Sequence, residues 1–115
     1  MTNEELKTAL RLGPGSRELS DAVLLACGWT QSAAGNWYAT NGVFHVGMDV
    51  AQSVDDALEF VPEDRGFWHV SRFPNRGGDA PGYEMWMYSE TGDSPIEVHA
   101  PTLALAICAA VMELE

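Results

Sequence analysis

Basic residues are scarce in this chain of 115 residues. Lysine and arginine together number 6, against 17 aspartates and glutamates, and the formal net charge is −11. A field of that sign repels phosphate backbones, so direct binding of nucleic acid is not expected. The composition leaves two interpretations of the acidity open: it keeps a small protein soluble, or it offers an acidic surface to a basic partner.

Cysteines and long apolar runs are also scarce. Cys27 and Cys108 are the only cysteines, and without a spaced framework they are expected to be reduced and buried. The longest apolar run, 103–112, is too short to span a bilayer, and the first residues lack the pattern of a signal peptide. We therefore expect a cytoplasmic protein without membrane association, made of a single domain over residues 1–115.

Three segments of the first half have helical periodicity and capping residues. Thr2 and Glu5 form a capping-box pattern before the first of them. Ser16 can cap a second helix, and Ser53 begins a short third helix that Pro62 closes. These signals predict helices that start directly after residues 2, 16 and 53.

A fourth helix is predicted from Pro101 to about Leu114, with Pro101 in its first turn. This helix is apolar on almost every side. Such a helix usually lies between layers of structure or between subunits, and on that ground we predict a homo-oligomer.

The strongest strand signals are two aromatic-rich segments, 67–73 and 83–89, separated by a loop rich in glycine and proline. Large apolar residues alternate onto both faces of these strands, so both faces need cover. Shorter extended segments are predicted at 29–31, 37–40 and 96–99, while 43–48 fits either a strand or an ordered loop. The predicted fold class is α+β: one antiparallel sheet covered by helices on both faces, an α-β-α sandwich.

Three segments of the chain carry a family resemblance: Glu18-Leu19 through Cys27-Gly28-Trp29, Ser53 through Leu58, and Pro101 through Ala110. In order and spacing the chain resembles the phage ABA sandwich domain over roughly residues 3 to 114. The resemblance implies an α-β-α layered fold and a bacteriophage accessory protein that acts in the cytoplasm of the host bacterium, where such proteins often counter host defence. The family defines no catalytic residues, so none are carried over.

No chemically reactive grouping is visible in the sequence. His45, His69 and His99 are isolated, and neither an H-x-x-x-H nor a C-x-x-C pair occurs, so no metal site is predicted. A nucleophile elbow and a paired catalytic carboxylate motif are also missing. We therefore expect a protein that is not an enzyme, with no catalytic residues and no cofactor.

A candidate ligand-binding site surrounds the loop after residue 73. Three of the six basic residues lie between 65 and 76, and guanidinium groups beside glycine amides can hold a phosphate or a carboxylate. Aromatic residues of the same hairpin can stack on a nucleobase. The other interpretation is a solvated hairpin loop over a packed aromatic core. The candidate site consists of Arg65, Trp68, Arg72, Arg76, Gly77, Trp86 and Tyr88.

Two further groups bear on partners. Trp29, Trp37 and Tyr38 are expected to pack in the core, but Trp37 or Tyr38, if exposed, would be an interface anchor. The acidic run from Asp49 to Asp64 is either solvated or a surface for a host protein. The leading hypothesis is a counter-defence protein that sequesters a small anionic, nucleotide-like ligand. The alternative is an acidic inhibitor of a host defence protein or of a nucleic-acid-binding protein.

Overall fold

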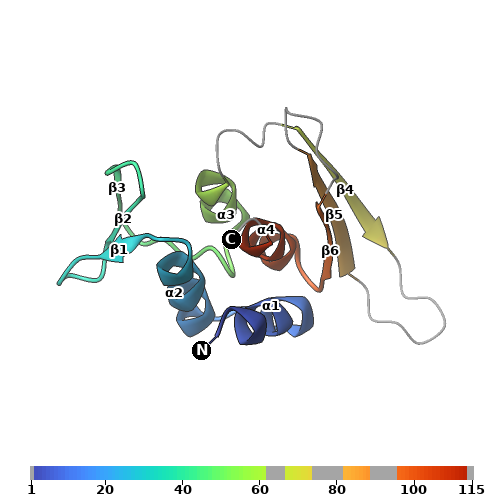
Figure 1. The fold of residues 1–115 in the computed structure, drawn as a ribbon, viewed down its shortest axis with the longest axis horizontal. Helices are drawn as coiled ribbons and strands as arrows, with labels where there is room; N and C mark the ends of the chain where they lie inside the picture. The colour runs from blue at the N-terminus through green and yellow to red at the C-terminus, as the bar shows by residue number, and fades with distance from the viewer. Residues whose placement is uncertain (1, 62–66, 74–81, 89–95, 114–115) are drawn as a thin grey trace.

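The computed structural model describes residues 2–61, 67–73, 82–88 and 96–113, and for residues 67–73 and 88 it describes the backbone alone. Helices and strands alternate irregularly along these ranges (Figure 1). The helices are α1 Asn3–Leu12, α2 Arg17–Ala26, α3 Val54–Phe60 and α4 Leu103–Met112. The strands are β1 Thr30–Gln31, β2 Trp37–Tyr38, β3 Phe44–His45, β4 Phe67–Phe73, β5 Gly82–Tyr88 and β6 Ile96–Ala100.

The three predicted helix starts of the first half are confirmed. The hydroxyl of Thr2 accepts a hydrogen bond from the Glu5 amide, and the Glu5 carboxylate accepts one from the Thr2 amide, which completes the capping box. Ser16 accepts from the Leu19 amide, and Ser53 caps α3 in the same way. These side chains satisfy backbone amides that have no partner inside the helix.

The start of α4 differs from the prediction. Thr102 is the N-cap residue, and its hydroxyl accepts a hydrogen bond from the Leu105 amide. Pro101 therefore lies before the helix and not in its first turn. A threonine that can satisfy an orphan amide is the better cap, because proline offers no side-chain acceptor.

The strands form two separate antiparallel sheets and not the single sheet that was predicted. One has the order β1-β2-β3 and is called the meander here; the other has the order β4-β5-β6 and is called the main sheet. Each meander strand is two residues long. In the main sheet the register pairs Trp68 with Met87 and Glu84 with His99.

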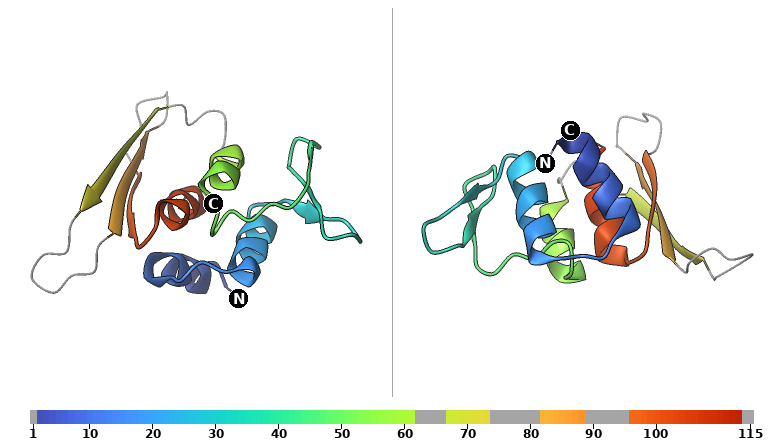
Figure 2. Two further views of the ribbon diagram at one scale, coloured as in Figure 1. Left: turned by 180° about the vertical axis from the view of Figure 1, so that it is seen from behind. Right: turned by 90° about the horizontal axis from the view of Figure 1, so that it is seen from below.

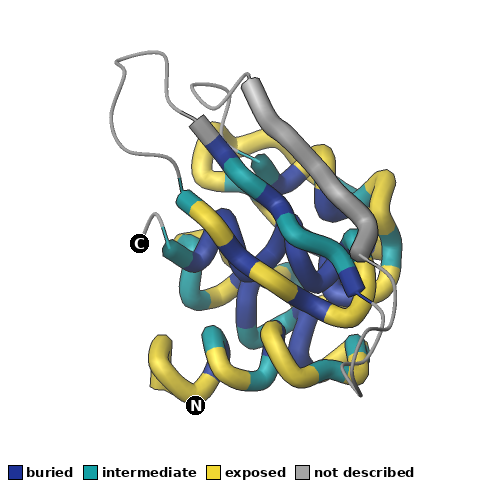
Figure 3. Tube along the Cα trace, turned by 90° about the vertical axis from the view of Figure 1, so that its right-hand side faces the viewer, coloured by how far each residue is buried: buried dark blue, intermediate teal, exposed yellow. Residues whose placement is uncertain are grey.

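The helices lie between the two sheets, with the meander at one end of the molecule and the main sheet at the other (Figures 1 and 2). Helix α4 packs on β5 and β6, and α1 and α3 pack on α4. The α+β class and the antiparallel main sheet are thus confirmed. Within the described ranges, helices cover one face of the main sheet. The opposite face is turned to the viewer in Figure 3, where β6 alternates between exposed and buried residues.

The core forms around α4. Every residue from Ala104 to Met112 is buried, against Met85, Met87 and Val98 of the main sheet and Leu10 of α1. The predicted position of this helix between layers is confirmed, and the layers belong to one chain. Self-association therefore stays a prediction that α4 no longer supports.

Two side chains fix the segment between the meander and α3. The Ser20 hydroxyl of α2 accepts a hydrogen bond from the Val50 amide at 2.8 Å, and the Cys108 thiol of α4 donates one to the Val50 carbonyl at 3.0 Å. The main-chain N–H and C=O of the buried residue Val50 are therefore both satisfied by side chains, as burial requires. Arg17 adds a hydrogen bond to the Met48 carbonyl at 3.0 Å.

Candidate functional site

The residues of the predicted ligand site are only partly placed. Arg65, Arg76 and Gly77 lie outside the described residues. Positions 68 and 72 belong to β4, and Trp86 and Tyr88 belong to β5. The loop that motivated the prediction, residues 74–81, also lies outside the described residues.

The register of the main sheet divides these positions between its two faces. Trp68 is paired with Met87, and Arg72 with Tyr83. Directly paired residues of an antiparallel ladder belong to the same face, so positions 68 and 72 belong to the face that carries the buried Met87. Trp86 belongs to the opposite face. One flat ligand on one face of the sheet cannot contact both groups.

A cleft of about 460 Å³ lies where β5 and α4 begin. Its walls include Tyr83, which is the register partner of Arg72, and the capping residue Thr102. Backbone amides of the first turn of a helix attract anions. The cleft therefore adjoins both the start of a helix and the register partner of Arg72. Its lining residues are Gln52, Val54, Gly82, Tyr83, Pro101, Thr102, Leu103 and Ala104.

The basic side chains that the structure describes are engaged elsewhere. Lys7 and Arg11 form ion pairs with Glu113, the latter at 2.8 Å, and Lys7 also pairs with Glu4. Arg17 is bound to a backbone carbonyl. The three remaining basic residues are arginines 65, 72 and 76, and their side chains lie outside the described part of the chain.

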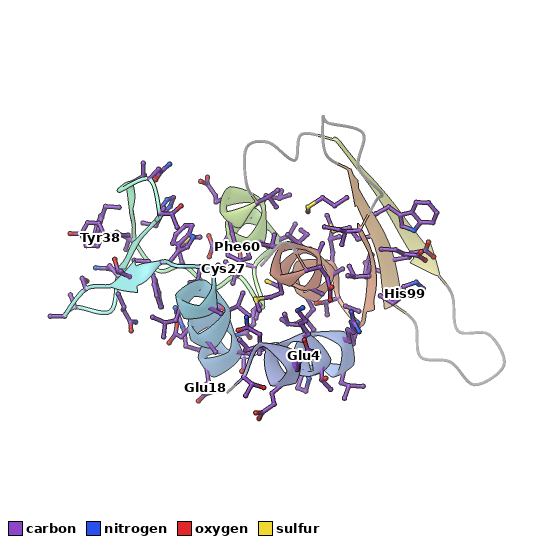
Figure 4. The ribbon with its side chains drawn as sticks, in the orientation of Figure 1. Glu4, Glu18, Cys27, Tyr38, Phe60 and His99 are labelled. Carbon is purple, nitrogen blue, oxygen red and sulfur yellow. The ribbon has the colours of Figure 1, made fainter. Side chains whose placement is uncertain are left out.

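The meander carries an exposed apolar patch. The rings of Tyr38 and Phe44 lie 5.1 Å apart between centroids, on directly paired positions of β2 and β3. Val43 and Val46 lie within two residues of Phe44 in the sequence and are exposed as well, Val46 by 74%. Tyr38 is 43% exposed and points away from the helices (Figure 4). An exposed Tyr38 was expected to be an interface anchor, because aromatic residues dominate the binding energy of interfaces. Tyr38 is exposed, so it is a candidate anchor. The apolar patch consists of Tyr38, Val43, Phe44 and Val46.

The opposite side of the meander is packed. Trp37 is fully buried, and the ring of Trp29 lies 5.0 Å from that of His45 and 6.2 Å from that of Phe60. Two of the three aromatic residues expected in the core are therefore buried, and Tyr38 is the exception. Through Trp29, this packed side connects His45 of the meander to Phe60 of α3.

The surroundings of the apolar patch are acidic. No lysine or arginine occurs between Arg17 and Arg65. Helix α3, whose Phe60 ring packs on Trp29 just before β1, exposes Asp55 and Glu59. The potential of this end of the molecule is therefore negative. The acidic residues of this part of the sequence are Glu18, Asp21, Asp49, Asp55, Asp56, Glu59, Glu63 and Asp64.

Sequence reasoning missed a group of side chains on the outer face of the main sheet. Glu84, Glu97 and His99 bring one ligand atom each within 4.8 Å of one another. Glu84 is distant in sequence, and only the β5–β6 register brings it opposite His99. The Glu97-x-His99 spacing, which places two side chains on one face of a strand, was the available signal.

Neither Cys27 nor Cys108 is in a disulfide bond. Cys108 is buried, and burial raises the pKa of its thiol far above the usual range, with the neighbouring Cys27 adding to the effect. Cys27 is partly buried, and its thiol lies 3.7 Å from the Met112 sulfur. A thiol held in the protonated form is a poor nucleophile.

No protein-family model matches the chain, and neither curated proteins nor solved structures give a significant match. The resemblance to the phage ABA sandwich domain therefore stays a prediction. In the described ranges, every helix falls short of the length and apolarity needed to cross a membrane. The fold and the candidate sites define an acidic α+β domain. It has the apolar patch at one end and the group of two carboxylates and one histidine at the other (Figure 4).

Proposed function

We propose that this protein is a non-enzymatic binding protein whose apolar patch and acidic surroundings engage a basic host protein. The observation that carries the proposal is the exposed patch of Tyr38, Val43, Phe44 and Val46. Aromatic anchors supply most of the energy of protein interfaces, and opposite charge accelerates and orients the encounter. This was the alternative among the functions expected from the sequence. It is preferred now because the patch is exposed and the predicted ligand residues divide between two faces.

The resemblance adds a setting to this proposal. In it, the protein is a bacteriophage accessory protein in the host cytoplasm, and its partner is a defence protein or a nucleic-acid-binding protein that the phage inhibits. A positively charged partner surface of that kind complements the negative field around α3 and the meander.

Capture from bacterial lysate with a matched pair of variants tests the proposal. Val46→Ser removes a patch residue that is 74% exposed, and Leu12→Ser removes an apolar residue on α1 that is 72% exposed. We expect specific partners to be lost about tenfold with Val46→Ser combined with Phe44→Ser, because hot-spot residues contribute about 1–2 kcal/mol or more. Leu12→Ser should capture them as wild type does, and capture should weaken with salt.

Two outcomes contradict this function. Equal recovery of the captured proteins by the patch variant and by Leu12→Ser shows that the patch is not the contact. Capture that does not weaken with salt contradicts an electrostatic contribution of the acidic residues around the patch. Circular dichroism of each variant confirms that the fold is retained.

A second candidate function is sequestration of a small anionic, nucleotide-like ligand. The cleft between β5 and α4 favours it, since the cleft adjoins Tyr83, the register partner of Arg72. A thermal-shift screen of nucleotides tests it, because a ligand at 100 times its Kd stabilises the native state by about 2.7 kcal/mol. Arg72→Ala should abolish the shift, whereas Arg11→Ala, which removes an ion-paired arginine, should not. An absence of stabilisation across the panel contradicts this candidate.

A further inference from the structure

The outer face of the main sheet gathers three potential metal ligands. Glu84 of β5 is the direct register partner of His99 of β6, and Glu97 lies two residues before His99 on the same strand. Side chains two residues apart on a strand share a face, and directly paired residues share a face as well. The fold therefore brings two carboxylates and one imidazole together on the side of the sheet that faces away from α4 (Figure 3).

The distances in this group match those between the ligands of a single small ion. His99 Nε2 lies 3.3 Å from Glu97 Oε1 and 3.9 Å from Glu84 Oε2. A tetrahedral zinc ion with bonds of about 2.0–2.2 Å holds its ligand atoms roughly 3.3–3.6 Å apart. The distance from His99 to Glu97 lies in this range, and the distance from His99 to Glu84 is slightly longer.

A neighbouring side chain orients one of the ligands. The indole N–H of Trp86 donates a hydrogen bond to Glu84 Oε1, and this leaves Oε2 as the oxygen turned toward His99. Metal-binding carboxylates are commonly held by such outer hydrogen bonds, and these bonds fix the direction in which the free oxygen points.

The ion would have access and room for further ligands. His99 and Glu97 are about half exposed and border a cleft of about 460 Å³ that Arg11 also lines. Arg11 is paired with Glu113 at 2.8 Å, which reduces its repulsion of a cation at His99. Three protein ligands leave at least one position of a tetrahedral ion for water.

We propose that Glu84, Glu97 and His99 form a binding site for one divalent transition-metal ion of the zinc class. The imidazole selects against magnesium and calcium, which prefer oxygen ligands alone, and favours zinc, copper or nickel. Binding bridges β5 and β6 and so stabilises the edge of the main sheet. This site is independent of the apolar patch, which lies at the other end of the molecule (Figure 4).

Calorimetric titration of the purified full chain with ZnCl₂, after treatment with a chelator, tests the site. We expect one equivalent of zinc to bind and the melting temperature to rise with zinc concentration. His99→Gln and Glu97→Gln should each weaken binding at least about tenfold, because even outer-shell changes at metal sites cost about 10–100-fold. Magnesium and calcium should not compete with zinc.

The matched controls replace a histidine and a carboxylate elsewhere. His45→Gln changes a partly buried histidine of the meander, and Glu59→Gln changes an exposed carboxylate of α3. Both should bind zinc as wild type does. Zinc binding that is lost equally in the controls, that persists in His99→Gln, or that is absent from the wild type overturns the proposal. X-ray absorption of the zinc-loaded protein gives a second readout, in which a first shell without a histidine nitrogen also overturns it.

Discussion

Replacing Ser20 by alanine should destabilise the protein more than the small change in side-chain volume suggests. Ser20 is fully buried on α2, and its hydroxyl accepts the hydrogen bond of the Val50 amide at 2.8 Å. Alanine fills nearly the same space but leaves this buried amide without an acceptor. The cost is then the desolvation of an unsatisfied donor and not merely the loss of one hydrogen bond.

The expected loss for Ser20→Ala is about 1–3 kcal/mol in the free energy of unfolding. On a domain of this size, each kcal/mol lowers the melting temperature by roughly 4 °C. Urea denaturation followed by circular dichroism measures it, with the midpoint shifted and the slope unchanged, because the surface exposed on unfolding stays the same.

Ser32→Ala is the matched control. Ser32 accepts a hydrogen bond from the Asn36 amide at 3.2 Å in the β1–β2 turn, at a partly exposed position where water can replace the hydroxyl. We expect a loss of no more than about 0.5 kcal/mol there. The reasoning is refuted when Ser20→Ala stays within that range of wild type, or when both variants lose the same amount.

Three other perturbations have defined outcomes. Gly15→Ala should cost about 1–3 kcal/mol in urea denaturation, because a Cβ atom there overlaps the Ala51 carbonyl oxygen; a neutral result contradicts this close approach. Thr102→Ala should cost about 1 kcal/mol through the lost cap of α4, and Thr102→Ser, which keeps the hydroxyl, should restore most of it. The raised pKa of Cys108 means that the native state retains a proton that the unfolded thiol loses above about pH 8.5, so stability should fall by up to about 1.4 kcal/mol per pH unit from there upward. That part of the slope should vanish in Cys108→Ala, and an identical alkaline slope in both proteins argues against the assignment.

Local signals were sufficient for most elements. The capping residues Thr2, Ser16 and Ser53 have one preferred use, so the starts of α1, α2 and α3 were predictable. Strands β4 and β5 were predictable within one residue, because alternation over seven positions has no helical interpretation. Pro101 was misleading since both the first turn and the residue before the cap accept proline.

Long-range arrangement was less accessible. The sequence of the two-residue meander strands does not predict whether they pair with one another or with β4–β6. That choice depends on where α2 and α3 pack, which is a property of the whole chain. The apolar surface of α4 had the same ambiguity, because an apolar helix is buried equally well by its own chain or by a second copy.

The candidate sites show the same difference between local signals and long-range arrangement. An exposed Tyr38 was foreseen as a possibility because the aromatic cluster was visible in the sequence, whereas its exposure depends on which face of β2 is buried. The carboxylate–histidine group was missed because register alone brings Glu84 to His99. Motif searches along one strand detect only the Glu97 and His99 half of it.

The hydrogen bonds that Ser20 and Cys108 form with the main-chain N–H and C=O of Val50 have a consequence for recognition. It joins the meander to the helices at a fixed point, so the surface that carries Tyr38 and Phe44 is preorganised before any partner arrives. A preorganised surface loses little configurational freedom on association, and more of its contact energy appears as affinity.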